Sequence, residues 1–321
     1  MRVAVVGLGV IGKVHLKVIA ETDNQLVSVC DINGDKLASF SNVSVYTDYV
    51  TMLENEKIDV VHICTPHYLH TQMIIEALNR NINVLCEKPL CIKKEDIPLI
   101  LSAEQKSTAQ LGVCFQNRYN TSTLLVKEYL KNEEIISATA SLRWHRDKEY
   151  YLQGGWRGKK NTEGGGVLIN QALHTIDLLQ YFCGMPKSIC AVCENLSLQG
   201  VIEVEDTATL TLFGENQVTL YATNTAERDY PVEIKVQTKS ATVRMLPDCV
   251  WINEVMHDCK NISEIYGKKV YGIGHRSLIK DYYDCISANR KFEIDGKEAS
   301  KAVMIVLSAY ESNGNVFDIK N

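Results

Sequence analysis

The sequence predicts an α/β protein that begins with a doubly wound parallel sheet and continues into a second α/β domain with a large, open, mostly antiparallel sheet. In roughly the first 115 residues, short apolar runs alternate with longer helical patterns, which is typical of βαβ units. After about Tyr119, candidate strands follow one another closely, which favours antiparallel pairing. The length of 321 residues suits two domains. We therefore predict domains over residues 1–119 and 120–321.

The elements of the first half are short apolar strands separated by helices. The predicted strands are Arg2–Val6, Leu26–Cys30, Val43–Tyr46, Asp59–Cys64, Asn83–Cys86 and Gln110–Phe115, and the main helical patterns are Ile11–Glu21, Tyr68–Arg80 and Lys93–Lys106. Because runs such as Val3–Val6 are apolar at every position, we expect helices on both faces of this sheet.

The second half opens with a helical stretch, Thr121–Lys131, and a long strand candidate, Ile135–Arg146. A helix is predicted from about Val167 to Cys183, and Thr and apolar residues alternate along Thr207–Phe213, as in a sheet with two different faces. The other predicted strands are Ser188–Leu196, Gln217–Thr223, Val232–Thr238 and Thr242–Leu246, and helices return at Gly274–Ala288 and Glu298–Ser312.

Composition excludes several classes of protein. The formal charge is −5, whereas a nucleic-acid-binding protein normally carries a basic surface. No apolar run approaches the roughly 18 residues of a membrane helix, and Met1–Gly12, interrupted by glycines, is predicted to be structure rather than a signal peptide. Eleven scattered cysteines suit a reducing cytoplasm. Cys190 and Cys193 would point to opposite faces of a strand, so no metal site is predicted there.

A glycine-rich turn follows the first predicted strand. Gly7-Leu8-Gly9-Val10-Ile11-Gly12 matches G-x-G-x-x-G and leads into a predicted helix. The first glycine permits a tight turn, the second lets a pyrophosphate approach the backbone, and the third lets helix and strand pack closely. Asp31 ends the next strand, where a carboxylate accepts hydrogen bonds from an adenosine ribose and repels a 2′-phosphate. The pattern predicts a Rossmann nucleotide site that prefers NAD to NADP.

Other polar residues also fall at the carboxyl ends of predicted strands, where ligands bind in open parallel sheets. Thr65-Pro66 follows the fourth strand, Glu87-Lys88-Pro89 the fifth and Gln116-Asn117-Arg118 the sixth. A lysine at the floor of a cleft, beside a cationic nicotinamide ring, would have a lowered pKa suited to proton transfer. On spacing alone, Lys88 could equally be a solvated loop lysine.

A third group of polar residues lies in the second half. After Trp156-Arg157 and the glycines at 164–166, the residues Asn170, His174 and Asp177 would share one face of the predicted helix. An imidazole with a carboxylate one turn away can act as an acid or base near neutral pH. The alternatives are a surface His–Asp pair and a core histidine, and a metal is not predicted because the face carries a single histidine.

Together, these motifs resemble those of the Gfo/Idh/MocA family, the glucose–fructose oxidoreductase and inositol dehydrogenase-like enzymes. The resemblance spans essentially the whole chain. The matching segments are Gly7-x-Gly9-x-x-Gly12-x-x-His15, Cys64-Thr65-Pro66-x-x-x-His70, Glu87-Lys88-Pro89, Trp156-Arg157, Gly164–Asp177, Gly274-His275 and Ala309-Tyr310-Glu311-Ser312.

The resemblance implies reversible hydride transfer between nicotinamide and a carbinol of a sugar, sugar acid or polyol. Lys88 and His174 would handle the proton, and Asp177 would orient His174. The substrate-binding residues would be Lys88, Arg118, Asn170 and His174; the cofactor-binding residues would be Gly7, Gly9, Val10, Ile11, Gly12, Asp31, Cys64, Thr65, Pro66, His70, Glu87, Lys88, Gln116, Trp156 and Arg157. Many family members have Asp where this chain has Asn170, and Asn cannot accept a proton as a carboxylate does.

Two other functions remain open from the sequence. The first is an NAD-dependent glycosidase or sugar-cleaving enzyme that oxidises the sugar ring transiently and retains its NAD. The second is a non-enzymatic, cofactor-sensing regulatory protein, which the presence of both Lys88 and His174 disfavours. The resemblance also implies a homodimer or homotetramer formed through the C-terminal sheet, with neither nucleic acid nor membrane as a partner.

Overall fold

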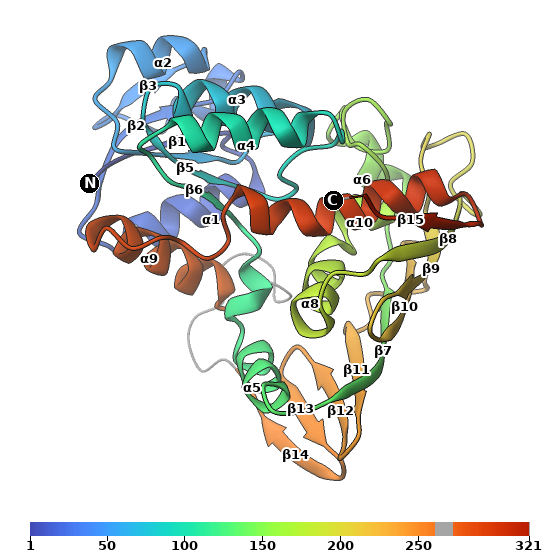
Figure 1. Cartoon of the computed structure of the whole chain (residues 1–321). Helices are drawn as coiled ribbons and strands as arrows, with labels where there is room; N and C mark the ends of the chain where they lie inside the picture. Colours follow the sequence, from blue (N-terminus) through green and yellow to red (C-terminus); the bar gives the residue numbers. More distant parts are fainter. Residues whose placement is uncertain (261–271, 321) are drawn as a thin grey trace. The chain divides into compact units, whose positions relative to one another are not determined.

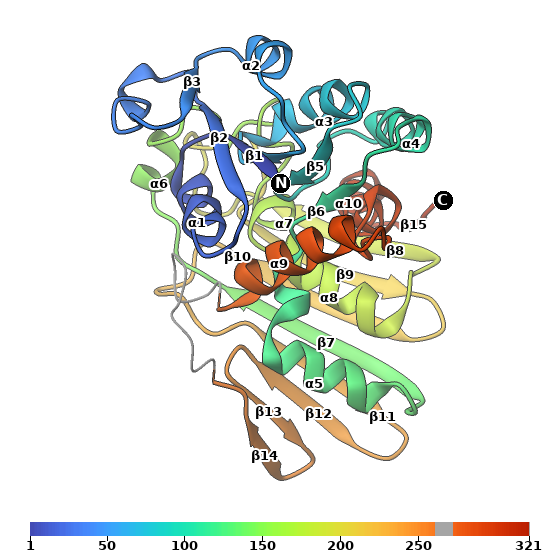
Figure 2. The same cartoon turned by 90° about the vertical axis from the view of Figure 1, so that its left-hand side faces the viewer.

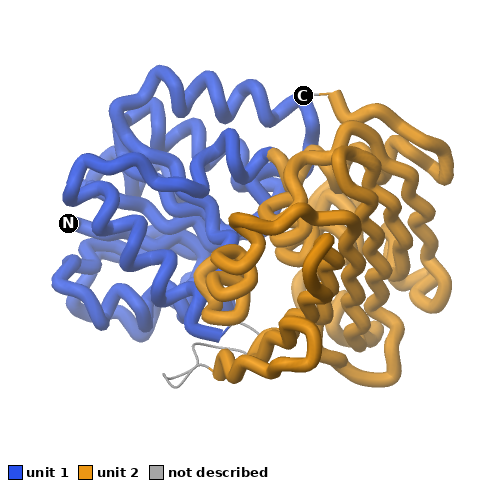
Figure 3. Tube along the Cα trace, turned by 60° about the horizontal axis from the view of Figure 1, so that its bottom comes forward, with its two compact units in different colours: residues 1–116, 264–300 blue, residues 117–263, 301–321 orange. Residues whose placement is uncertain are grey.

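The computed structural model describes residues 1–260 and 272–320. The chain forms two compact units (Figure 3). The first comprises residues 1–116 and 264–300, and the second comprises residues 117–263 and 301–321. The first unit is therefore built from two separate segments of the chain. The expected division into residues 1–119 and 120–321 placed the second of these segments in the other domain.

The first unit contains a six-stranded sheet in which every pair of neighbouring strands is parallel. Its order is β3-β2-β1-β4-β5-β6, so the strand order reverses beside β1. This is the Rossmann arrangement that the sequence predicts. The strands are β1 (Arg2–Val6), β2 (Gln25–Cys30), β3 (Ser44–Tyr46), β4 (Val60–Ile63), β5 (Asn83–Cys86) and β6 (Leu111–Val113).

Helices cover both faces of this sheet (Figures 1 and 2). On one face, α1 (Val10–Ile19) packs against α9 (Gly274–Ser287); the other face carries α2 (Tyr49–Asn55), α3 (His70–Leu78) and α4 (Asp96–Lys106). The ring of Tyr282 on α9 lies beside Gly112, and its hydroxyl is 2.8 Å from the carbonyl oxygen of Val84 and 2.7 Å from that of Gln110. Thus α9, which follows the second unit in sequence, completes the core of the first.

The second unit contains a nine-stranded sheet in the order β14-β13-β12-β11-β7-β10-β9-β8-β15. Neighbouring strands are antiparallel except β7 and β10, which are parallel, so the predicted mostly antiparallel sheet is confirmed. The strands are β7 (Ile135–Arg143), β8 (Ser188–Glu194), β9 (Thr207–Phe213), β10 (Gln217–Thr223), β11 (Glu233–Thr238), β12 (Thr242–Leu246), β13 (Cys249–Ile252), β14 (Val255–Asp258) and β15 (Val316–Asp318).

Helices α5 (Thr121–Leu130), α7 (Val167–Asn170) and α8 (Leu173–Cys183) pack on one face of this sheet. Residues of β7 show the resulting difference between faces, because Ala138, Ala140 and Leu142 are buried whereas Thr139 is exposed. The remaining helices are α6 (Lys148–Leu152) and α10 (Gly296–Ser312), and 3₁₀ turns lie at Gly34–Lys36, His67–Leu69 and Gln116–Tyr119.

The helix predicted from Val167 to Cys183 is interrupted. The amides of Gln171 and Ala172 both donate to the carbonyl oxygen of Val167, at 3.1 and 2.8 Å. The second of these bonds is an i→i+5 step, which widens the helix locally. Asn170 therefore ends α7 and His174 lies in the first turn of α8, so the two residues do not share one continuous helix.

None of the helices in the described part of the chain is both long and apolar enough to cross a membrane.

Candidate active site

The glycine loop joins β1 to α1. Gly7 has a φ of +89°, and a Cβ atom there would lie 2.5 Å from the carbonyl oxygen of Cys64. A Cβ on Gly12 would lie 1.9 Å from the carbonyl oxygen of Gly7, whereas a Cβ on Gly9 would meet nothing within 4 Å. The first and third glycines therefore permit close packing within the protein, and the second borders open space. This is the combination that a dinucleotide pyrophosphate requires.

Asp31 follows β2 and lies against this loop. Its Oδ2 accepts from the amide of Leu8 (2.8 Å) and from Lys36 Nζ (2.9 Å), and its Oδ1 accepts from the amide of Asn33 (2.9 Å). Burial raises the pKa of Asp31, but these hydrogen bonds outweigh burial and leave the pKa below its usual value. A carboxylate is thus held ionised at the position where a ribose hydroxyl of NAD binds in Rossmann folds.

His70 connects two loops at the strand ends. The fully buried ring lies with Nδ1 2.7 Å from the carbonyl oxygen of Pro89 and Nε2 3.0 Å from that of Thr65. Burial lowers the pKa of His70 despite these two contacts. A neutral imidazole has one N–H group, so His70 donates to one of the two carbonyls at a time. His70 thereby holds the loop after β4 close to the turn after β5.

That turn carries Glu87, Lys88 and Pro89. The Lys88–Pro89 peptide bond is cis, Lys88 is half-buried, and its amide donates to Glu87 Oε2 (3.3 Å). The Glu87 Oε1 atom lies 3.0 Å from His15 Nε2 and 3.2 Å from His275 Nε2. Burial raises the pKa of Glu87, but the two imidazoles more than offset it, so the pKa lies well below its usual value.

In the second unit, Arg118 and Asp177 form a buried bidentate ion pair. Arg118 Nε donates to Asp177 Oδ2 (2.8 Å) and Arg118 Nη2 to Asp177 Oδ1 (2.5 Å); the residues are 4% and 1% exposed. The guanidinium also lies 4.4 Å from the ring centre of Tyr181. The sequence assigned these two residues to separate roles. In the structure they join the 3₁₀ turn at Gln116–Tyr119 to α8.

Asn170 is held by a carboxylate that sequence analysis did not identify. Asn170 Nδ2 donates to Glu163 Oε1, and the amide of Gly158 donates to Glu163 Oε2 (2.5 Å). Glu163 is 1% exposed, and burial raises its pKa to about 7 despite these bonds. Glu163 stands directly before the three glycines, which is the only signal in the sequence that could have drawn attention to it.

A second buried carboxylate, Glu205, accepts hydrogen bonds from the backbone at the end of the glycine segment. Its Oε2 accepts from the amide of Gly166 (2.9 Å), and its Oε1 accepts from the amide of Leu168 (3.0 Å) and the hydroxyl of Tyr310 (2.9 Å). A Cβ on Gly165 would lie 2.0 Å from the Tyr310 hydroxyl. A Cβ on Gly166 would lie 1.9 Å from the carbonyl oxygen of Glu205, so the close approaches at residues 165 and 166 require glycine there.

Arg157 lies over two aromatic rings. Its guanidinium lies 4.9 Å from the ring centres of both Tyr150 and Trp156. Its Nε is buried and has no hydrogen-bond partner among the described residues. A cation with a donor to spare suits an anionic ligand.

The predicted residues therefore fall into two sets. The strand ends of the first unit bring together the glycine loop, Asp31, the loop at residues 64–66, His70 and the Glu87–Pro89 turn. The second unit carries Arg118, Asp177, Asn170, the half-buried His174, and Trp156 with Arg157; Gln116, which is 2% exposed, ends the first segment of the first unit.

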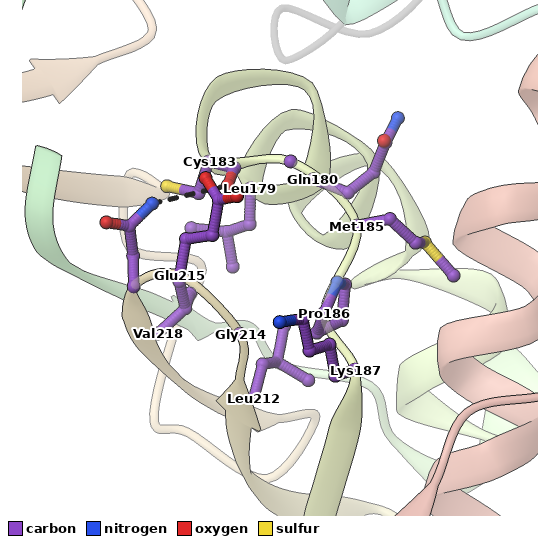
Figure 4. Close-up of a pocket in the computed structure, with 12 residues that line it drawn as sticks. Leu179, Gln180, Cys183, Met185, Pro186, Lys187, Leu212, Gly214, Glu215 and Val218 are labelled. Atoms are coloured by element: carbon purple, nitrogen blue, oxygen red, sulfur yellow. Dashed lines mark hydrogen bonds between the residues drawn. The ribbon is translucent and has the colours of Figure 1, made fainter. Parts of the chain in front are cut away.

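A surface pocket in the second unit lies apart from these residues (Figure 4). It is formed by the end of α8 and the turn between β9 and β10, and Asn216 Nδ2 donates to the carbonyl oxygen of Cys183 at its edge. None of its lining residues belongs to the predicted site.

Comparison with known proteins identifies the family. Residues 1–115 match the family model "Oxidoreductase family, NAD-binding Rossmann fold", and residues 131–244 match the "GFO/IDH/MocA C-terminal domain". The uncharacterized oxidoreductase YrbE of Bacillus subtilis is 23% identical over 328 residues, covering 96% of this chain and 93% of YrbE. D-glucoside 3-dehydrogenase of Escherichia coli is 32% identical over 204 residues, covering 60% of this chain and 57% of that enzyme.

A solved structure agrees over the full length. The WlbA dehydrogenase of Bordetella pertussis, in complex with NADH and UDP-GlcNAcA, is 25% identical and superposes with a TM-score of 0.90, covering 100% of this chain and 98% of WlbA. Both family models and the fold thus agree with the glycine loop and the ionised carboxylate that follows β2. The chain belongs to the Gfo/Idh/MocA family of NAD-binding oxidoreductases.

Proposed function

We propose that this protein is an NAD-dependent dehydrogenase or reductase that exchanges a hydride between the cofactor and a carbinol of a sugar, sugar acid or polyol. The observation that carries the proposal is the cradle of Gly7, Gly9 and Gly12, in which only the second glycine borders open space. When bound there, NAD supplies the hydride acceptor. Asp31, held ionised beside the loop, would accept from its ribose hydroxyls and disfavour NADP.

We propose that Lys88 and His174 handle the transfer of the proton of the substrate hydroxyl. Lys88 is supported by its turn, which His70 and Glu87 hold on either side. His174 is supported by its place in the first turn of α8, one turn before the buried Asp177. Because Asn170 cannot take up a proton, the transfer falls to the amine and the imidazole.

Substrate binding is assigned to Asn170, Arg157 and Arg118. The Nδ2 atom of Asn170 donates to Glu163, which fixes the orientation of the amide that we assign to a substrate hydroxyl. Two nitrogens of Arg118 donate to Asp177, which fixes the orientation of the guanidinium that we assign to substrate contact. The stacked Arg157 suits a carboxylate or phosphate.

Arginine side chains in the site favour a sugar that carries an acid group. The WlbA structure contains UDP-GlcNAcA, which makes this compound the first to test. A thermal-shift screen with NAD present should rank it with other sugar acids, sugars and inositols, because a ligand of the native state raises its apparent stability. The absorbance of reduced nicotinamide should then report turnover of the best ligand.

Replacing Lys88 by Met and His174 by Ala tests the assigned roles. Each change should lower kcat by about 100-fold or more, the usual contribution of a general acid or base. The matched controls are Lys93→Met, an exposed lysine in the same unit, and His257→Ala on β14. If Lys88→Met and His174→Ala both turn over as fast as their controls, the assignment is wrong.

We further propose a homodimer or homotetramer that works in the cytoplasm. In the described part of the chain, α5, α7 and α8 pack on one face of the sheet of the second unit, and Tyr221 (42%) and Val192 (47%) are exposed on its strands. All eleven cysteines are free thiols, which suits a reducing compartment.

A further inference from the structure

Five side chains of the first unit form one continuous hydrogen-bonded chain. The Tyr283 hydroxyl lies 2.7 Å from His62 Nε2, and His62 Nδ1 lies 2.7 Å from His15 Nδ1. His15 Nε2 then lies 3.0 Å from Glu87 Oε1, which His275 Nε2 approaches from another side at 3.2 Å. We call these residues the imidazole chain: Tyr283, His62, His15, Glu87 and His275.

The imidazole chain is buried throughout. His15 and His62 are fully buried, and His275, Tyr283 and Glu87 are 1%, 3% and 6% exposed. Its members come from α1, β4, the turn after β5, and α9, which are distant in sequence. A buried polar group is costly unless its hydrogen bonds are made, so these contacts determine where each proton lies.

The proton positions follow from the charge of Glu87. An ionised carboxylate only accepts, so His15 and His275 both carry a proton on Nε2. Neutral His15 must then accept at Nδ1, which places a proton on His62 Nδ1. Neutral His62 accepts at Nε2 from the Tyr283 hydroxyl. Burial lowers the pKa of His15 and His62, which agrees with neutral rings. Each of these four hydrogen bonds has one donor and one acceptor.

The same atoms could in principle bind a metal, since ligand atoms of His15, Glu87 and His275 all lie within 4.8 Å of one another. The hydrogen bonds account for the arrangement without an ion, because both Nε2 atoms already have the carboxylate as an acceptor. To bind a metal, both Nε2 atoms would have to lose their protons and direct their lone pairs at the ion. Elemental analysis of the purified protein decides whether a metal binds at this position.

We propose that the imidazole chain is a positioning device for Lys88, in which His62 donates to Nδ1 of His15 and thereby holds the Nε2-protonated ring against the Glu87 carboxylate, next to Lys88 in the chain. This inference rests on the proposed role of Lys88. The mechanical link is short, because Glu87 precedes Lys88 in sequence and its Oε2 accepts from the Lys88 amide. His62, on the central strand β4, is the residue that connects Tyr283 on α9 to His15 on α1.

Long-range proton–nitrogen NMR spectra of the histidine rings give a direct test in the whole protein. We expect His15 protonated on Nε2 and His62 on Nδ1, the two opposite tautomers. In Tyr283→Phe and His62→Leu the next ring of the chain loses one of its two hydrogen-bond partners, so its ring-nitrogen shifts should change while the remaining partner keeps its tautomer. A His15 ring protonated on Nδ1 in the native protein would overturn the inference, as would a stoichiometric metal found by elemental analysis.

Kinetics separate positioning from a merely structural role. His62→Leu should lower kcat about tenfold while the KM for NAD changes by less than about twofold, since a small displacement of a catalytic group costs rate rather than cofactor binding. His62→Gln should restore kcat to within about threefold, because its amide can donate to His15 and its carbonyl oxygen can accept from Tyr283. Val61→Ala, a buried change on the opposite face of β4, is the matched control for lost packing.

Wild-type kcat in a folded His62→Leu variant would refute the inference, and so would equal losses in His62→Leu and Val61→Ala. If the wild-type protein turns over no sugar, the proposed function fails, and the tautomers of His15 and His62 still decide whether the imidazole chain exists. The two failures are therefore distinguishable.

Discussion

The surroundings of individual carboxyl groups in this protein shift their pKa values in opposite directions. Asp31 and Glu87 are buried, yet each receives enough hydrogen bonds to remain ionised. Glu163 receives two and has a pKa of about 7, because burial outweighs them and Glu205 adds a second negative charge. Glu163 therefore titrates near neutral pH.

The raised pKa of Glu163 predicts a pH dependence of stability. The native state holds the proton up to about pH 7, whereas the unfolded chain releases it near its ordinary value of 4.5. The native protein therefore binds more protons between these values, and its free energy of unfolding falls as pH rises through this window, by roughly 3 kcal/mol.

Glu163→Gln mimics the protonated side chain and should remove this dependence. Urea unfolding at pH 5 and pH 8 should show the variant gaining relative to the wild type on going to the higher pH. The exposed Glu215→Gln change should leave the difference between the two pH values unchanged. Parallel wild-type and Glu163→Gln profiles would contradict the prediction.

The Arg118–Asp177 pair predicts strong coupling between two residues. Asp177→Leu alone leaves a buried guanidinium without its carboxylate and should cost about 3–5 kcal/mol of unfolding free energy. Adding Arg118→Met removes the orphaned charge and should recover most of that loss. A double-mutant cycle measured by urea unfolding checks this, and purely additive losses would show that the pair is not coupled.

At the scale of elements, the glycine loop separates packing from binding. Gly12→Ala places a Cβ against the backbone of Gly7, so it should push α1 away from β1 and lower the melting temperature. Gly9→Ala places a methyl group in open space. It should leave the melting temperature nearly unchanged and weaken NAD binding at least tenfold, by blocking the approach of the pyrophosphate.

Calorimetry with and without NAD measures both effects in this pair of variants. The informative result is the contrast between a lowered melting temperature in Gly12→Ala and weakened NAD binding in Gly9→Ala. A Gly9→Ala variant that binds NAD as the wild type does would show that the cofactor does not use this loop.

The elements show where sequence patterns succeed and fail. The apolar runs and the glycine motif predicted the parallel sheet and its nucleotide loop, because those features depend on local sequence. The break between α7 and α8 depends on bonds from Gln171 and Ala172 to Val167, which leave no periodic signal. The β13–β14 hairpin turns at Asn253, with a φ of +54°, and lacks the glycine that marks most such turns.

Contacts between residues far apart in the chain could not be predicted from the sequence. Arg118 and Asp177 were each identified, but nothing in their spacing connects a turn after β6 to the middle of α8. His62 stands within an apolar run and was treated as part of a buried strand. Its burial was correctly expected, whereas its partners, His15 and Tyr283, become visible only when α1 and α9 lie on the same face.

For the whole molecule, the open face of the large sheet predicts self-association. Pairing places Val192, Thr209, Tyr221 and Ser141 in one row across four strands of that face. Light scattering with size-exclusion chromatography should give a dimer or tetramer. Val192→Lys with Tyr221→Lys should shift it toward monomer by burying charge at the interface, without lowering the melting temperature of the monomer. A monomeric wild type would contradict the proposal.

The late position of α9 in the chain has a consequence for synthesis. As the protein leaves the ribosome, its first 116 residues emerge with the nucleotide loop complete but with the neighbourhood of Gly112, His15 and His62 lacking Tyr282, His275 and Tyr283. Nascent chains must therefore keep an unfinished apolar surface in solution until α9 has been translated. Chaperones that recognise such surfaces have their longest opportunity during this interval.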